Sequence, residues 1–409
     1  MKHILVACLL ISTACKPLPV QKPFPQEYQL TSVRIPLGRT IQSTEMELIN
    51  DFLVYHTYSF LFYSVSDQSF TYSLGSRSQP VFRTPQIIRS SLPYLYIMDV
   101  DNKNEIRKYM IDSIGYPVLL QTGFAGVNTA MNRPYILNDS LIVYDEFVPE
   151  ASLKIYNMHT HKEERVLQYG ATSLDDRFFD KKMGGLYAND SCMAFAYKYQ
   201  DRIDFYDWQF NLIRSVNHQL SDPVIHKEKE NYLKNIHYYG YSYMGRNYFY
   251  TLYRGISNSI FYSDSLAYYL DLLYDYGLTR DVLEVYDLNG EPVCRFRFND
   301  VAPAVFVVDE EQNILMGHRV AYTDSLLLYH LQGLPKNRKK YTEKVHVALS
   351  FFPDIAPPED PVEIIRFRSI GNMIGLMDKP RYWVYYEYSE NRLFNTPEAR
   401  GAFTASIAE

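Results

Sequence analysis

Short apolar runs recur along the chain and are separated by polar turns that contain Asn, Asp or Ser. In the clearest copies a polar turn is followed by an apolar run, a polar gap and a second apolar run that ends near a tyrosine. Two such copies begin with the same turn, NDS. The turn at Asn138 is followed by LIVYDEF, and the turn at Asn189 is followed by CMAFAY. Runs of this length bounded by turn residues are typical of β-strands. The pattern therefore predicts a chain built mainly from short strands.

The same unit occurs at seven places, the last of them only as a candidate copy. The turns that open the copies lie at residues 50–51, 90–91, 138–140, 189–191, 245–247, 311–313 and 371–372. Most copies continue into a further strand-like run, such as PVCRFRF after the DLNG turn that ends at Gly290. Units of this kind that repeat every 40 to 60 residues or so are typical of the four-stranded antiparallel blades of a β-propeller. We expect an all-β fold with six blades; seven blades and a large β-sandwich are the alternatives.

Two segments interrupt the strand pattern with helical signals. Asp222–Pro223 precedes residues 224–239, and Ser263–Ser265 precedes an apolar stripe at helical spacing that ends at Gly277. Acidic or hydroxyl caps, a Pro at the first turn and a Gly at the stop are helix boundary signals. We expect two short helical insertions. The stripe of the second either packs on a blade or forms a binding surface, and packing is the simpler interpretation.

The N-terminus reads as a targeting signal. Lys2 and His3 precede an apolar run over Ile4–Ile11 that is too short to span a bilayer, and small residues lead to Cys15. This pattern resembles a bacterial lipoprotein signal, which is cut before the cysteine that then carries lipid. The alternatives are ordinary secretion after the small residues, or an apolar N-terminus that is not processed. The resemblance implies a cell-envelope protein anchored by lipid to the outer membrane, on its periplasmic face or on the cell surface.

These patterns divide the chain into four parts. Residues 1–14 form the signal peptide, and residues 15–29 form a Pro-rich tether. Residues 30–395 form the β-propeller, of which 332–395 are either a C-terminal extension or an extra blade. Residues 396–409 form a tail.

Composition supports this interpretation and excludes one class of partner. The 409 residues include 38 Tyr, a residue that suits half-buried strands, and 47% of the chain is hydrophobic, which excludes intrinsic disorder. The formal net charge is −6. Because there is no excess of Lys and Arg to neutralise phosphates, the chain is not expected to bind nucleic acid. Tyrosines could also serve as stacking platforms for a glycan or a peptide, although packing between blades explains them with fewer assumptions.

The cysteines do not form a disulfide framework. Cleavage removes Cys8 and lipid occupies Cys15, which leaves Cys192 and Cys294 in apolar, strand-like surroundings. Two thiols in a chain of this size indicate small buried side chains.

The nucleophile elbow G-x-S-x-G, the phosphate-binding G-x-x-x-x-G-K-[ST], the dinucleotide-binding G-x-G-x-x-G and the metal-binding H-E-x-x-H are absent from the sequence. His159 and His161, with Glu163 nearby, could face the same way as metal ligands, but three or four converging ligands are needed and a solvated turn is the simpler interpretation. Asp175 and Asp176 could be a carboxylate pair for acid catalysis, or they could begin a helix. We assign no catalytic, metal or cofactor residues, and Cys15 is the only assigned site residue.

A basic run at 338–340 is interpreted as a solvated face, with contact to membrane headgroups as the alternative. The segment around it, first basic and then Pro-rich, is typical of an exposed connection.

Three stretches resemble a known family. RNYFYTLYRG (246–255), VLEVYDLNGEPVCRFRFND (282–300) and AVFVVDEEQNILMG (304–317) are similar to the TolB-like six-bladed β-propeller lipoproteins of the bacterial envelope. FTYSLGSRSQPVFRTP (70–85) stands where that family has a glycine-rich turn, and it keeps Gly75 and Pro80 but not the full glycine pattern. The resemblance covers residues 30–331. It implies that an N-terminal strand over Leu30–Leu37 closes the ring against the strand near residue 329, and it supplies no catalytic residues.

Two functions are compatible with these observations. The first is a lipid-anchored, non-catalytic binding or scaffolding module with a protein, peptide or glycan partner. The alternative is an envelope enzyme, a glycan lyase or hydrolase, that acts at the mouth of the propeller channel. A purely structural subunit would instead present a flat apolar surface.

Overall fold

The computed structural model describes residues 23–334, except 42, 44, 58, 76–80, 103, 126–130, 147–149, 172–181, 219–223, 227–233, 258–281, 301 and 319–322. Within these described residues the regular structure consists of strands, the 3₁₀ turn Val100–Asn102 and a 3₁₀ residue at Lys234. The same residues contain no helix long and apolar enough to cross a membrane. The all-β prediction is therefore confirmed.

Three sheets each contain four strands. In the first and second, the strands pair in chain order as antiparallel meanders: β3 (Glu45–Ile49), β4 (Phe52–His56), β5 (Phe60–Ser64) and β6 (Ser69–Leu74); β15 (Gly184–Ala188), β16 (Met193–Tyr197), β17 (Arg202–Tyr206) and β18 (Leu212–Asn217). The third sheet joins the two ends of the described chain: β23 (Val305–Asp309), β24 (Ile314–His318), β25 (Thr323–His330) and β2 (Val33–Ile41).

The two remaining sheets are larger. One has eight strands and divides into two antiparallel meanders joined by a short parallel pairing of β7 with β11. Its strands are β7 (Pro85–Ser90), β8 (Leu95–Asp99), β9 (Glu105–Ile111), β10 (Pro117–Phe124), β11 (Asn132–Leu137), β12 (Leu141–Glu146), β13 (Glu150–Asn157) and β14 (Lys162–Ala171). The other is β19 (Ile236–Met244), β20 (Tyr248–Ser257), β21 (Val282–Asp287) and β22 (Pro292–Phe298), with β1 (Glu27–Leu30) added in parallel to β22.

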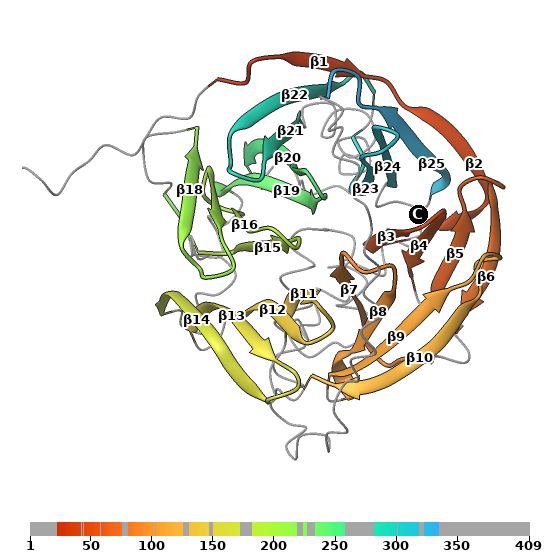
Figure 1. Cartoon of the computed structure of the whole chain (residues 1–409). Coiled ribbons are helices and arrows are strands. Elements are labelled where there is room, and N and C mark those ends of the chain that lie inside the picture. The colour runs from red at the N-terminus through yellow and green to blue at the C-terminus, as the bar shows by residue number, and fades with distance from the viewer. Residues whose placement is uncertain are drawn as a thin grey trace, which may run out of the picture.

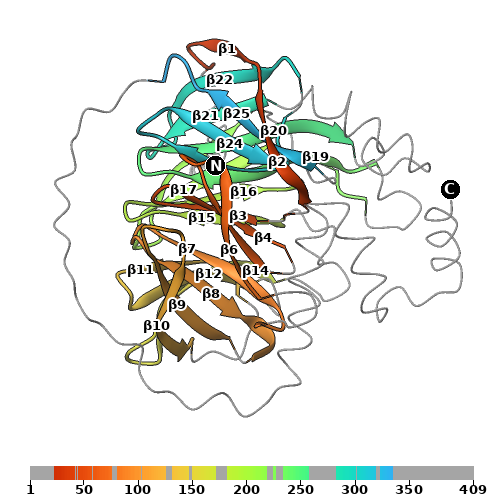
Figure 2. The ribbon, with the colours of Figure 1, turned by 90° about the vertical axis from the view of Figure 1, so that its right-hand side faces the viewer.

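The sheets are arranged around a common centre as in a β-propeller (Figure 1). The first strand of each meander lies innermost, and β3, β7, β11, β15, β19 and β23 each contact the next strand of this series, with β23 returning to β3. Figure 2 shows the ring from the side. Side chains of these six strands therefore face, or flank, the centre of the ring.

The N-terminal strand closes the ring. Val33 of β2 lies opposite Leu328 of β25 in an antiparallel pairing. This is the arrangement that the family resemblance implies. The chain before it also pairs, since the Arg295 amide donates to the carbonyl of Gln26 and β1 begins at Glu27, within the segment assigned to the tether.

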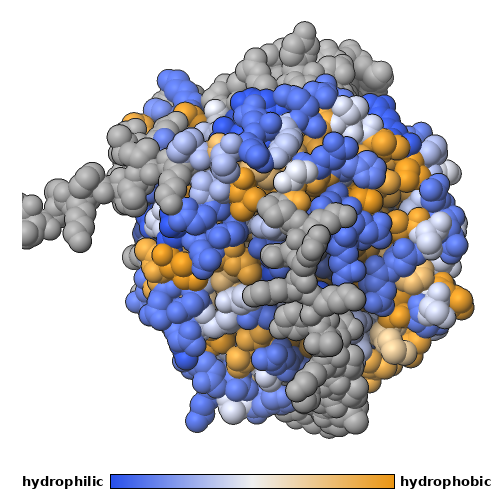
Figure 3. All heavy atoms as spheres, turned by 45° about the horizontal axis from the view of Figure 1, so that its top comes forward, coloured by the Kyte–Doolittle hydropathy of each residue, from blue (hydrophilic) through white to orange (hydrophobic). Residues whose placement is uncertain are grey.

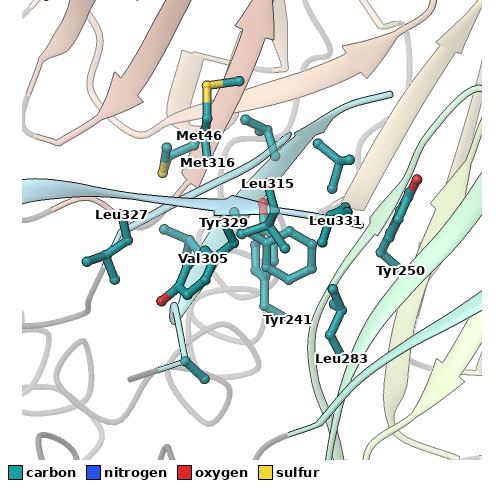
Figure 4. Close-up of a cluster of buried hydrophobic side chains, with 14 of the residues drawn as sticks. Met46, Tyr241, Tyr250, Leu283, Val305, Leu315, Met316, Leu327, Tyr329 and Leu331 are labelled. Atoms are coloured by element: carbon teal, nitrogen blue, oxygen red, sulfur yellow. The ribbon is translucent and has the colours of Figure 1, made fainter. Parts of the chain in front are cut away.

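The apolar core fills the spaces between neighbouring sheets. Its largest cluster includes Met46, Val305, Leu315, Tyr329 and Leu331, which gather between strands in Figure 4. Close-packed aliphatic and aromatic side chains of this kind are the main favourable contribution to folding.

The strands predicted from the repeat are confirmed almost run for run, and the DLNG turn that connects β21 to β22 has Gly290 at φ 76°. One helical prediction, over 224–239, is not confirmed where the structure describes this segment. Val224–His226 are irregular, Lys234 is a 3₁₀ residue, and Ile236–Met244 form β19, whose tyrosines pack between sheets. Residues 227–233, the second insertion over 266–277 and the seventh repeat near 371 lie outside the described residues.

Candidate binding site at the centre of the ring

Among the described residues, His159, His161 and Glu163 belong to no group that could hold a metal ion. His159 and His161 are exposed on the turn between β13 and β14, and Glu163 contacts Lys154 with its Oε1 2.9 Å from Nζ. The solvated-turn interpretation is therefore confirmed. Cys15, the carboxylate pair at 175–176 and the basic run at 338–340 lie outside the described residues.

Cys192 and Cys294 are free and buried, as predicted. Burial raises the pKa of each thiol to about 12. Both are therefore neutral packing groups and not nucleophiles.

Tyrosine at the end of the third strand of a meander is a packing residue. The five examples that the repeat singled out are all buried in the clusters between sheets: Tyr63, Tyr156, Tyr206, Tyr286 and Tyr329. These five tyrosines therefore cannot serve as stacking platforms for a glycan or a peptide.

A different set of polar residues occupies the centre of the ring. Arg89 of β7 donates from Nη2 to the hydroxyl of Tyr241 on β19 at 2.6 Å. Its Nε lies 3.1 Å from Oε2 of Glu47 on β3, an ion pair without the alignment of a hydrogen bond. In the ring order, β11 and β15 separate β7 from β19 on one side, and β23 and β3 on the other. Arg89 therefore reaches across the centre.

The guanidinium of Arg89 is held in one plane. Its Cζ lies 4.7 Å from the ring centroid of Tyr243, a cation–π distance. Nη1 is buried and has no hydrogen-bond partner, although 22% of the side chain is accessible to solvent. A buried donor left unpaired costs about 1–3 kcal/mol. Arg89 thus combines a fixed orientation with a buried terminal nitrogen, Nη1, that has no hydrogen-bond partner.

Burial also affects the neighbouring acid. Removal from water raises the pKa of Glu47, which the positive charge of Arg89 lowers in part and the charge of Glu45 raises further. Glu47 is accessible over 13% of its side chain. The centre is therefore polar and partly solvated, unlike the apolar core between the sheets.

A second arginine lies in the same ring of strands. Arg133 of β11 has φ 45° where the pairing with β12 is irregular, a backbone conformation that a non-Gly residue rarely adopts. Its Cζ lies 4.8 Å from the ring centroid of Tyr187 on β15. A methyl group added at Gly185 would lie 2.4 Å from Nη1 of Arg133. The glycine therefore makes room for the guanidinium, and uncommon backbone geometry of this kind concentrates at functional sites.

Arg254 of β20 also has a glycine packed against its guanidinium. It is buried, and a methyl group at Gly240 of β19 would lie 2.7 Å from its Cζ. Gly240 also lies in an irregular stretch of the pairing between β19 and β20.

A second polar cluster joins two sheets away from the centre. Nδ1 of His218 lies 2.6 Å from Oδ1 of Asp201, and its Nε2 lies 3.2 Å from Oε1 of Glu284. Burial lowers the pKa of His218, but these two carboxylates outweigh it and raise the pKa to about 9. Arg295 also contacts Glu284, and the phenol of Tyr239 contacts Asp201 at 3.2 Å. A histidine held as a cation by two acids is a joint between sheets and not a poised base.

The polar turns of the repeat also join neighbouring sheets. Asn189 donates from Nδ2 to the carbonyl of Gly245 at 2.7 Å. Glu310 accepts from the amides of Asn247 at 2.9 Å and Tyr248 at 3.2 Å. The turn residues therefore act between sheets as well as within them.

The sequence repeat missed the central residues because it began at the turn after the first strand of each meander. That first strand carries Glu47, Arg89, Arg133 and Tyr241. The sequence signal that could have pointed to these residues was a charged side chain within an otherwise strand-like run, as at Arg89. Among the described residues, no group of three or more His, Cys, Asp or Glu side chains could hold a metal ion.

No protein-family profile matches the chain, and no curated protein matches its sequence significantly. The fold and the central polar cluster are therefore the basis for a functional assignment.

Proposed function

We propose that this chain is a lipid-anchored β-propeller of the cell envelope that acts as a non-catalytic binding module, with its ligand site at the centre of the ring. The observation that carries the proposal is the polar contact of Arg89 with Tyr241 and Glu47, on strands that converge from different sheets. Arg89 and Glu47 are accessible to solvent in part, whereas the largest core cluster between the sheets is apolar. Ligand sites in closed β architectures are formed in this way at the mouth or centre.

The ring in this proposal has six blades. The division of the eight-stranded sheet into two meanders supports this number, since only a short parallel pairing joins them. The closed series of six innermost strands supports it as well. The similarity of residues 246–317 to the TolB-like lipoproteins agrees with the same count.

The anchor in this proposal is lipid on Cys15, followed by the Pro-rich tether. Fractionation of cells that produce the full chain tests this part. The wild type is expected in the membrane fraction, and Cys15→Ala is expected in the soluble envelope fraction. Unchanged fractionation of the variant would contradict lipid anchoring.

A surface made mainly of one apolar patch would favour a structural subunit instead. On the face in Figure 3, apolar described residues form separate patches among polar ones. The face in this view therefore does not offer the single flat apolar patch that a purely structural subunit would present there.

Capture of the partner tests the binding function. The anchored wild type, Tyr241→Phe and the surface control Tyr116→Phe are captured from native envelopes. We expect a protein, peptide or glycan partner that is retained by the wild type and the control and is weakened by Tyr241→Phe. Equal capture by all three, or no partner with any, would overturn a ligand site at the centre. Turnover of a captured glycan would favour the lyase or hydrolase alternative.

A further inference from the structure

We propose that the centre of the ring recognises a carboxylate, which Arg89 and Arg133 hold between them. This inference rests on the proposed ligand site and names the chemical class of its ligand. The carboxylate belongs to a small ligand, either an acidic sugar or the C-terminus of a peptide.

Arg89 provides the first half of the site. Tyr241 occupies Nη2 and Glu47 lies beside Nε, so two of the three guanidinium nitrogens already have protein neighbours. These contacts and the ring of Tyr243 fix the plane of the group. The third nitrogen, Nη1, has no hydrogen-bond partner. A carboxylate that approaches the end of the fork would accept from Nη1, and the fixed plane lowers the entropy lost on binding.

Arg133 provides the second half. Its guanidinium lies over the face of Tyr187 and against Gly185, in a backbone conformation that turns it out of the regular pairing of β11. Tyr135 of β11 lies opposite Arg89 in the parallel pairing with β7, and Arg133 is two residues before Tyr135 on the same strand. The two arginines therefore lie on neighbouring strands at the centre of the ring.

The neighbouring groups favour a carboxylate over other ligands. Arginine offers only donors, and its planar fork matches the two oxygens of a carboxylate. Glu47 stands next to Arg89, so a dianion such as phosphate would meet a like charge at short range. A neutral ligand would leave Nη1 without a charged acceptor. A single negative charge on a planar group fits these conditions best.

Titration calorimetry with the purified chain tests the inference. The probes are glucuronate with glucose as its neutral twin, the tripeptide Ala-Ala-Ala as free acid with its C-terminal amide as twin, and inorganic phosphate. We expect at least one acid to bind tenfold or more tightly than its neutral twin and more tightly than phosphate. Which acid binds identifies the source of the carboxylate. No binding by either acid, equal binding of a twin, or tighter binding of phosphate would overturn the proposal.

Substitutions then locate the site. Arg89→Lys and Arg133→Lys keep the charge but remove the fork, and each is expected to weaken binding of the acid at least tenfold. Arg214→Lys, which alters an ion pair with Glu291 at the edge of another sheet, is the control and should bind as the wild type does. Wild-type affinity in both central variants would overturn the proposal. Because the comparison of twins uses only the wild type, a variant that fails to fold does not affect the outcome.

The two proposals fail separately. Capture that depends on Tyr241, without preference for an acid over its twin, would refute the carboxylate and leave the binding function in place. Loss of both results would refute both proposals.

Discussion

Arg89 and Tyr241 are 152 positions apart in the chain, yet the arginine donates to the phenol at 2.6 Å from the far side of the ring. Each side chain has its hydrogen-bond partner on a different sheet from its own. The contact exists because β7 and β19 face each other across the centre, and it therefore reports directly on the closed ring.

Tyr241→Phe removes this contact. We expect a loss of about 1–3 kcal/mol in the free energy of unfolding, because Nη2 of Arg89 is left without its acceptor in a mostly buried site. Denaturant unfolding of the wild type and the variant measures the loss. Tyr116→Phe, at a half-exposed position on the turn before β10, is the control and should change stability by less than about 0.5 kcal/mol. Equal stability of Tyr241→Phe and the wild type would contradict the role of the phenol.

Gly185→Ala tests the close approach of β15 to Arg133. The added methyl group would lie 2.4 Å from Nη1 of Arg133, so the guanidinium must move. We expect a cost of about 1–3 kcal/mol, the range for overpacking. In an Arg133→Ala background the same substitution should cost much less, which a double-mutant cycle measures. Additive effects would show that the two residues do not meet.

The pH dependence of stability tests the joint at His218. Burial would lower the pKa of His218, but the carboxylates of Asp201 and Glu284 outweigh it and raise the pKa from 6.5 to about 9 in the folded chain. A raised pKa contributes stability that is fully present below pH 6.5 and is lost as pH rises through about 9. The contribution is about 3 kcal/mol at most.

His218→Gln isolates this term from other groups that titrate at high pH. The difference in unfolding free energy between wild type and variant should shrink between pH 6.5 and about 9. A difference that stays constant across this interval would contradict the ion pairs.

Asn189 tests the joints made by the polar turns. Its side chain donates to the carbonyl of Gly245 at 2.7 Å and accepts from the amides of Ser191 at 2.8 Å and Cys192 at 3.0 Å. Asn189→Ala should cost about 2–4 kcal/mol, since several buried groups lose partners together. Asn189→Asp keeps the acceptor but not the donor, and it should be less stable than the wild type. An unfolding midpoint unchanged in both variants would exclude a joint at this turn.

Thiol reactivity tests the burial of the two cysteines. With pKa values raised to about 12, Cys192 and Cys294 should not react with a thiol reagent near neutral pH in the folded chain. A chain that begins at Lys16 and so carries only these two thiols should show both after denaturation. Rapid labelling of the native chain would contradict the buried positions.

The sequence predicted the strands that its repeat contained. The polar turn at Asn189 and the run that ends at Tyr206 both fall at strand boundaries, because turn residues and alternating apolar residues act locally. The repeat also predicted that Tyr286 and Tyr329 pack between sheets, since tyrosines at equivalent places in a repeated unit share one environment.

The site could not be predicted in the same way. Arg89 and Arg133 stand in strands that the repeat did not include, and nothing near either residue in the chain names its partner. The helix expected through Tyr239 shows the same limit. The Asp cap and the proline were local signals, whereas the tyrosines of β19 pack against neighbouring sheets.

The sequence by itself determined an all-β chain, the places of its turns and the burial of the tyrosines that end its repeated runs, because these depend on backbone preference and on the period of side chains along a strand. The tertiary structure alone decided which residues meet at the centre. Closure of the ring through β2 and β25 sets the order of the sheets, and that order brings Arg89 to Tyr241. Contacts between residues so far apart depend on the assembly of whole sheets, and no local pattern encodes them.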